Sequence, residues 1–175
     1  SNPGDNNFRF IREDKDGVLF LATFGGGLKK FNSNLETFES YLHNPGDPST
    51  ISNDTVFYIS KEGKGGYSWV YTMHGGINRF DKNTGIFKYY RHNKDDSESI
   101  IGDFYLFLDN DSARGACFGT NRGISKYNIE KDNFDNYYYR NSNEEFYDTY
   151  GVNFVEMDRS GIFWLGTQGG GLVKY

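Results

Sequence analysis

Three histidines are the first residues of this chain whose type could support catalysis. His43 and His92 lie 49 residues apart and each precedes an asparagine. A structural role repeated along the chain explains this spacing better than general acid–base catalysis, which needs one positioned group. His74 occupies a segment where the corresponding parts of the chain carry glycine, which is typical of an exposed turn residue, with ligand contact as the alternative.

Two acidic runs, 14–17 and 109–112, have the composition of part of a calcium loop. Both lack the glutamate and the ligand count of a complete site, and both occur where a turn between two strands is expected. The glycine triplets resemble phosphate-binding loops, but no Lys-Ser/Thr pair follows them. No Ser/His/Asp set stands out in the sequence. We therefore expect no catalytic residue, no metal site and no cofactor, and we expect that this segment is not an enzyme.

The overall composition favours an all-β protein without nucleic-acid contacts. Aromatic residues make up 18% of the 175 residues and there are 22 glycines, which is typical of many strands joined by tight turns. The net charge of -5 disfavours binding to phosphate backbones. No stretch approaches the length of an apolar membrane span, and the segment carries no signal peptide. We expect no membrane contact by this segment.

A repeat of about 48 residues organises the sequence. Its clearest marker is a threonine that recurs at steps of 49, 48 and 47 residues. These threonines are Thr23, Thr72, Thr120 and Thr167. Soon after each one come a glycine with leucine or isoleucine and then an aromatic residue. The repeats are expected at approximately 6–52, 53–101, 102–149 and 150–175, the last one being incomplete.

Each repeat is predicted to form four short strands. Segments 18–22 and 162–166 are apolar on both faces, as expected for small sheets stacked face to face. In the second repeat we expect strands near 55–60, 67–72, 76–81 and 86–92. The predicted fold is all-β, with about four β-propeller blades, each a four-stranded antiparallel sheet, in a single partial propeller over 1–175. Propellers close with roughly four to eight blades, so we expect a fragment of a larger propeller that self-associates through open blade edges or a propeller face.

Two segments make the sequence similar to a known family. Residues 158–172 and the connection 43–54 resemble the two-component regulator propeller repeat. The resemblance implies the periplasmic sensor part of a hybrid two-component histidine kinase, with the kinase activity in a separate domain. It also implies a response to oligosaccharides derived from polysaccharides. The alternative is a propeller scaffold for protein–protein interaction or receptor dimerisation.

Ligand contacts are expected where the turn between the second and third strands meets the connection between repeats. The variable residues of these turns are Phe24, Met73, His74, Asn121, Arg122 and Gln168. Arg122 is the strongest candidate for ligand contact, because a guanidinium binds a uronate or sulfate group through two parallel hydrogen bonds.

Overall fold

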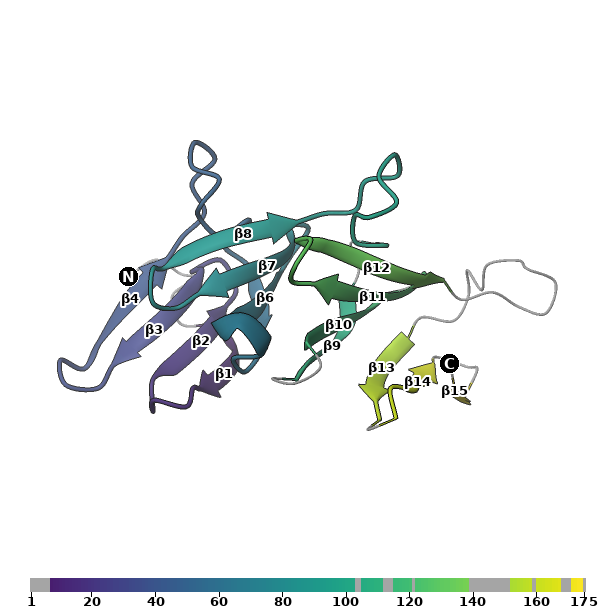
Figure 1. Ribbon diagram of the computed structural model, residues 1–175. Helices are drawn as coiled ribbons and strands as arrows, with labels where there is room; N and C mark the ends of the chain where they lie inside the picture. The colour runs from purple at the N-terminus through teal and green to yellow at the C-terminus, as the bar shows by residue number, and fades with distance from the viewer. Residues whose placement is uncertain are drawn as a thin grey trace. The chain divides into compact units, whose positions relative to one another are not determined.

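The computed structural model contains two compact units, Ser1–Tyr90 and Arg91–Tyr175, which are described separately. Each unit holds two antiparallel sheets, here called blades and numbered in chain order (Figure 1). The residues that the structure describes are 7–102, 105–111, 115–120, 122–138, 152–158, 160–167 and 171–174.

In the first unit, blade 1 has four strands that are neighbours in sequence order. They are β1 (Phe8–Glu13), β2 (Leu19–Thr23), β3 (Leu28–Asn32) and β4 (Thr37–Tyr41). Blade 2 repeats this order with β5 (Val56–Ile59), β6 (Ser68–Thr72), β7 (Gly76–Asp81) and β8 (Ile86–Tyr90). A 3-10 turn, η2 (Lys64–Gly66), lies between β5 and β6. The strands predicted for the second repeat are confirmed to within two residues at each end.

In the second unit, blade 3 is again a four-stranded meander. It contains β9 (Tyr105–Asp111), β10 (Gly115–Thr120), β11 (Gly123–Asn128) and β12 (Asn133–Tyr138). Blade 4 has three strands, β13 (Val152–Met157), β14 (Phe163–Thr167) and β15 (Gly171–Lys174). The predicted all-β class with antiparallel, propeller-like blades is confirmed.

The recurrent threonine is explained by the turn that it closes. Thr23 Oγ1 donates to the carbonyl oxygen of Gly27 at 2.7 Å and accepts from the N–H of Gly26 at 3.0 Å. Thr120 Oγ1 donates in the same way to the carbonyl oxygen of Gly123 at 3.1 Å. These threonines are fully buried, and a buried hydroxyl that both donates and accepts satisfies backbone groups that would otherwise lose their contact with water.

The connections between blades have a shared structure that accounts for the two spaced histidines. Nδ1 of His43 lies 2.8 Å from the carbonyl oxygen of Ile51, and Nδ1 of His92 lies 2.9 Å from that of Ile100. The structural interpretation of both residues is therefore confirmed. Each connection also pairs with the fourth strand of the blade that follows it. The Phe87 N–H donates to the Ser49 carbonyl, and the Phe134 N–H donates to the Glu98 carbonyl.

Blade 1 packs on blade 2 through two different faces. We call the side of a blade that packs on the following blade its trailing face, and the side that is packed on by the preceding blade its leading face. The trailing face of blade 1 presents Phe20, Ala22 and Leu28 with partly buried Phe10, Val18 and Tyr41. The leading face of blade 2 presents Val56, Ile59, Val70, Phe80 and Phe87. The ring of Tyr41 contacts those of Phe80 and Phe87, with centroids 5.2 and 5.7 Å apart. This apolar layer removes large aromatic and aliphatic side chains from water and is the core of the first unit.

The second unit repeats the same packing. The trailing face of blade 3 presents Cys117 and Ile124, with Tyr137 packed beside them. The leading face of blade 4 presents Val155, Met157, Phe163 and Leu165. Tyr137 contacts Phe163 with ring centroids 5.6 Å apart, as Tyr41 contacts blade 2. A trailing face on a leading face is therefore the packing rule in both units.

One prediction about the acidic runs is confirmed and the other is wrong. Asp14 forms a turn in which its Oδ1 accepts from the N–H groups of Asp16 and Val18, both at 2.9 Å. Residues 109–111 were expected in the equivalent turn, but they extend β9, and Asp111 pairs with Gly115. Gly115 has a φ of 87°, a backbone conformation that favours glycine.

Candidate functional site

In the first unit, the turn after β2 and the connection into β5 lie side by side. Phe24 forms an isolated bridge with Thr55, and the N–H of Met73 donates to the carbonyl oxygen of Thr55 at 2.9 Å. Phe24 and Met73, two of the residues predicted for a ligand site, therefore lie on either side of Thr55. The expected meeting of turn and connection is seen here.

A β-bulge interrupts the first strand of every blade close to its start. The register shifts between Phe8 and Phe10 in blade 1 and between Val56 and Tyr58 in blade 2. The extra residues in the four blades are Arg9, Phe57, Leu106 and Asn153. A bulge breaks the alternation of a strand and redirects a side chain, which separates Arg9 and Phe57 from the inter-blade packing.

Arg9 and Phe57 meet Phe24 in a cation–aromatic cluster, which we define as Arg9, Phe24, Phe57 and Tyr71. The guanidinium carbon of Arg9 lies 5.1 Å from the ring centroid of Phe24 and 5.9 Å from that of Phe57. Phe57 stacks on Tyr71 at 5.4 Å with 28° between the ring planes. Burial raises the pKa of the Tyr71 hydroxyl, which is uncharged at neutral pH.

This cluster combines a cation with aromatic rings, which are the chemical groups that suit an acidic, partly apolar ligand. Arg9 and Phe24 are exposed, whereas Phe57 and Tyr71 are half-buried. The ring faces hold the guanidinium in place through cation–π attraction, and its remaining N–H groups match the two oxygens of a carboxylate. Exposed aromatic rings also provide a flat surface for the C–H groups of a ligand.

In the second unit, Arg122 is held by a histidine of the connection. Nη1 of Arg122 lies 3.2 Å from Nε2 of His92. Since Nδ1 of His92 faces a carbonyl oxygen, the proton is assigned to Nδ1, and Nε2 accepts from the guanidinium. The predicted ligand residue Arg122 thus contacts the residue that shapes the connection.

The other predicted site residues fall in different places. His74 is exposed in the turn after β6 and has a φ of 54°. Asn121 and Gln168 lie outside the described residues. Arg9, Phe57 and Tyr71 were not predicted, because alternation alone assigns strand residues to a packed face and gives no signal for the bulges.

At the opposite end of the first unit, an ion-pair cluster joins the two blades. Nζ of Lys82 lies 2.7 Å from Asp14, 2.5 Å from Asp16 and 3.3 Å from Glu62. Lys15 contacts Glu62 at 2.6 Å. Burial opposes ionisation of Asp14, but hydrogen bonds from Lys82 and from backbone N–H groups outweigh it and lower its pKa. The hydrogen bond from Lys15 is the main cause of the lowered pKa of Glu62, and Lys82 adds to it.

Replacing Lys82 with methionine is expected to destabilise the protein by about 2 kcal/mol at pH 7, because it leaves the buried Asp14 carboxylate without its cation. Asp14 and Glu62 have lowered pKa values in the folded state, so their stabilising effect exists above the unfolded pKa values. It is lost as the pH falls through the folded ones. Urea unfolding at pH 7 and at a series of lower pH values measures the change, which should shrink as the pH falls through the lowered pKa values of Asp14 and Glu62.

A matched control for this prediction is Lys94→Met. Lys94 is exposed and lies 3.7 Å from the exposed Asp95, so its loss should change the free energy of unfolding by less than about 0.5 kcal/mol. A Lys82→Met effect of equal size at every pH value would show that lost packing, rather than lost ion pairs, is responsible.

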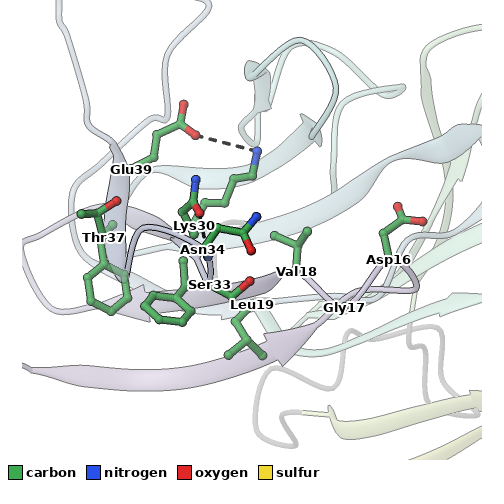
Figure 2. A pocket seen from close by; sticks show the side chains of 12 residues that line it. Asp16, Gly17, Val18, Leu19, Lys30, Ser33, Asn34, Thr37 and Glu39 are labelled. Atoms are coloured by element: carbon green, nitrogen blue, oxygen red, sulfur yellow. Dashed lines mark hydrogen bonds and ion pairs between the residues drawn. The ribbon is translucent and has the colours of Figure 1, made fainter.

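A hollow of about 450 Å³ lies at the same end of blade 1 (Figure 2). Its wall includes Asp16 and Val18 from the turn before β2, Leu19 from the start of β2 and Asn34 from the turn after β3. Lys30 and Glu39 form an ion pair of 3.8 Å beside it. None of the predicted site residues lines this hollow.

The described part of the chain holds no group of three or more His, Cys, Asp or Glu side chains that could bind a metal ion. Over those same residues, no helix has both the length and the apolar character needed to cross a membrane.

Comparison with known proteins finds solved structures of similar fold. No family model and no curated protein matches the sequence, so the propeller repeat family remains a resemblance. The extracellular domain of the candidate hybrid two component system BT3049 from B. thetaiotaomicron has a TM-score of 0.78 and 22% identity, over 97% of this chain and 23% of that one.

Two further structures extend this similarity. The extracellular domain of the candidate hybrid two component system BT4673 from B. thetaiotaomicron has a TM-score of 0.67 and 24% identity, over 97% of this chain and 23% of that one. PorZ, a surface component of the type-IX secretion system of Porphyromonas gingivalis, has a TM-score of 0.66 and 17% identity, over 99% of this chain and 26% of that one. This chain therefore spans about a quarter of the length of these proteins and shares their fold.

Proposed function

We propose that this chain is part of an extracytoplasmic, ligand-sensing domain of a hybrid two-component system sensor, and that it binds its ligand without converting it. The fold shared with the extracellular domains of two such systems supports this proposal. The resemblance of segments 43–54 and 158–172 to the regulator propeller repeat supports it independently and favours the periplasm. The sensor's kinase activity would belong to another part of the protein.

The proposed ligand is an oligosaccharide that carries an acidic group, released from a polysaccharide. The cation–aromatic cluster is the observation that carries this choice. Sugars present C–H groups on one face, which pack against aromatic rings such as Phe24. A uronate or sulfate group would accept two hydrogen bonds from the guanidinium of Arg9. Met73, half-buried beside Thr55, would extend the apolar contact.

Isothermal titration calorimetry with an oligogalacturonate and its neutral methyl ester tests this proposal. The acidic form is expected to bind about tenfold more tightly, which corresponds to about 1.4 kcal/mol. Arg9→Ala should remove this difference, because it removes the charged hydrogen bonds. Phe24→Ala should weaken both ligands, because it removes the stacking surface.

Leu35→Ala is the matched control, since Leu35 is exposed in the turn after β3, away from the cluster. It should leave both affinities unchanged. Unchanged binding by Arg9→Ala and Phe24→Ala would refute the assignment of the site. A loss on Arg122→Ala instead would move the site to the second unit.

A further inference from the structure

A second arginine of β1, Arg12, is also placed against aromatic rings. It follows Arg9 by three residues on the same strand. The guanidinium carbon of Arg12 lies 5.1 Å from the ring centroid of Phe10 and 5.9 Å from that of Tyr58. These two rings contact each other, with centroids 4.6 Å apart. The pairing of one arginine with two rings, seen in the cation–aromatic cluster, therefore occurs twice along β1.

The bulges and the strand register place Arg12 between the two blades of the first unit. Phe10 and Tyr58 are equivalent residues of consecutive blades, because each directly follows the extra residue of its bulge. Beyond the bulge, Arg12 lies opposite Phe20, which belongs to the core between blades 1 and 2. Arg12 is therefore on the side of β1 that faces blade 2, and the residues around it come from these two blades.

The charge of Arg12 is only partly compensated by its neighbours. Arg12 is half-buried, and its Nη2 donates to the hydroxyl oxygen of Tyr58 at 3.2 Å. Its Nε is buried and has no hydrogen-bond partner in the part of the chain that the structure describes. None of the ion pairs within those residues involves Arg9 or Arg12. Because a cation withdrawn from water without an anion is unfavourable, an acidic group brought by a ligand would stabilise Arg12.

Tyr58 supplies a second donor beside this guanidinium. Its side chain is half-buried, and its hydroxyl oxygen accepts from Arg12. The hydroxyl proton is therefore directed away from Arg12, where a ligand oxygen is able to accept it. A guanidinium and a hydroxyl side by side suit a carboxylate or a sulfate, whose several oxygens accept from both groups.

We infer that Arg12 and Tyr58 form a second subsite for an acidic group, so that an acidic oligosaccharide lies along β1 with one acidic group at Arg9 and another at Arg12. This inference rests on the proposed function, and it adds the length and the charge pattern of the ligand. Three residues of a strand span about 10 Å, which is longer than one sugar ring. The ligand therefore carries acidic groups on at least two of its sugar units, and a single acidic sugar occupies only one subsite.

Isothermal titration calorimetry with galacturonate and trigalacturonate tests the inference on the 175-residue chain. The parent chain is expected to bind the trimer at least about tenfold more tightly than the monomer. Arg12→Ala should bring the two affinities to within about twofold of each other, because the trimer loses its second anchor. The same variant should leave the affinity for the monomer unchanged, since Arg9 and Phe24 remain. Arg9→Ala should weaken the binding of both ligands.

A second variant and a matched control keep the test independent of folding defects. Arg12→Lys retains the positive charge and loses the planar fork of the guanidinium, so it should retain only part of the preference for the trimer. Arg79→Ala is the control, because Arg79 is also half-buried and lies over a ring, 4.4 Å from the centroid of Tyr67, but belongs to β7. It should bind both ligands like the parent chain, and circular dichroism should show that the variants are folded.

Three outcomes would overturn the inference, and they separate it from the proposed function. If both Arg12 variants kept the full preference for the trimer, the second subsite would be refuted, while a loss on Arg9→Ala would leave the first one standing. A parent chain that binds monomer and trimer equally would have the same meaning. A parent chain that binds neither ligand would refute the second subsite together with the proposed acidic ligand.

Discussion

Alanine at Gly27 is expected to destabilise the first unit by about 3–4 kcal/mol, whereas alanine at Gly25 should cost only about 1–2 kcal/mol. The two glycines lie in the same turn, with φ values of 73° and 87°, so both variants strain the backbone to a similar extent. A Cβ at Gly27 would also collide with the carbonyl oxygen of Tyr41, whereas nothing lies within 4 Å of a Cβ at Gly25. The difference between the two variants therefore isolates the steric term.

Urea unfolding followed by tryptophan fluorescence measures both free energies. Gly123 is the equivalent glycine of blade 3, where a Cβ would collide with the carbonyl oxygen of Tyr137, so Gly123→Ala should behave like Gly27→Ala. Equal losses for Gly25→Ala and Gly27→Ala would show that the fourth strand moves away readily. The close contact between turn and fourth strand would then not be a constraint on this position.

Truncation of Phe87 to alanine should cost about 3–4 kcal/mol, whereas truncation of Phe38 should cost less than about 1 kcal/mol. The two phenylalanines occupy the same position of consecutive blades. Phe87 stacks on Phe80 at 4.5 Å and contacts Tyr41 of the neighbouring blade, so its removal leaves a cavity. Phe38 is half-covered, and solvent fills the space that it leaves.

Thermal or urea unfolding at low protein concentration measures this pair, because dilution keeps the chains apart. A large effect of Phe38→Ala at every concentration would contradict the exposure of this side chain in the isolated chain.

Most of the fold could be predicted from the sequence because the repeat places equivalent residues in equivalent surroundings. Thr23 and Thr120 recur since each closes a turn with its buried hydroxyl, and the spaced histidines recur since each binds the connection. The extension of β9 through Asp111 was missed, because an acidic run signals a turn whether or not the ladder continues. Asp111 pairs with Gly115, whose φ of 87° favours glycine.

The candidate site could be predicted only in part. The sequence singled out Phe24 and Met73, because the equivalent turns differ at these positions, and both residues lie beside Thr55; their role in ligand binding stays a prediction. Arg9 and Phe57 were missed, because a bulge depends on hydrogen bonding between strands and leaves no periodic trace in the sequence. Their approach to Phe24 joins residues from two blades, and no local pattern reports such a contact.

The connections have a consequence for engineering. Since the Ser49 carbonyl binds the Phe87 N–H and the Glu98 carbonyl binds the Phe134 N–H, each connection is structurally a piece of the sheet that comes after it. A graft or duplication that cuts the chain directly before β5 or β9 would leave the outermost strand without this partner. A segment that is to be transferred should therefore begin at His43 for blade 2 and at His92 for blade 3, so that each sheet keeps the connection that precedes it.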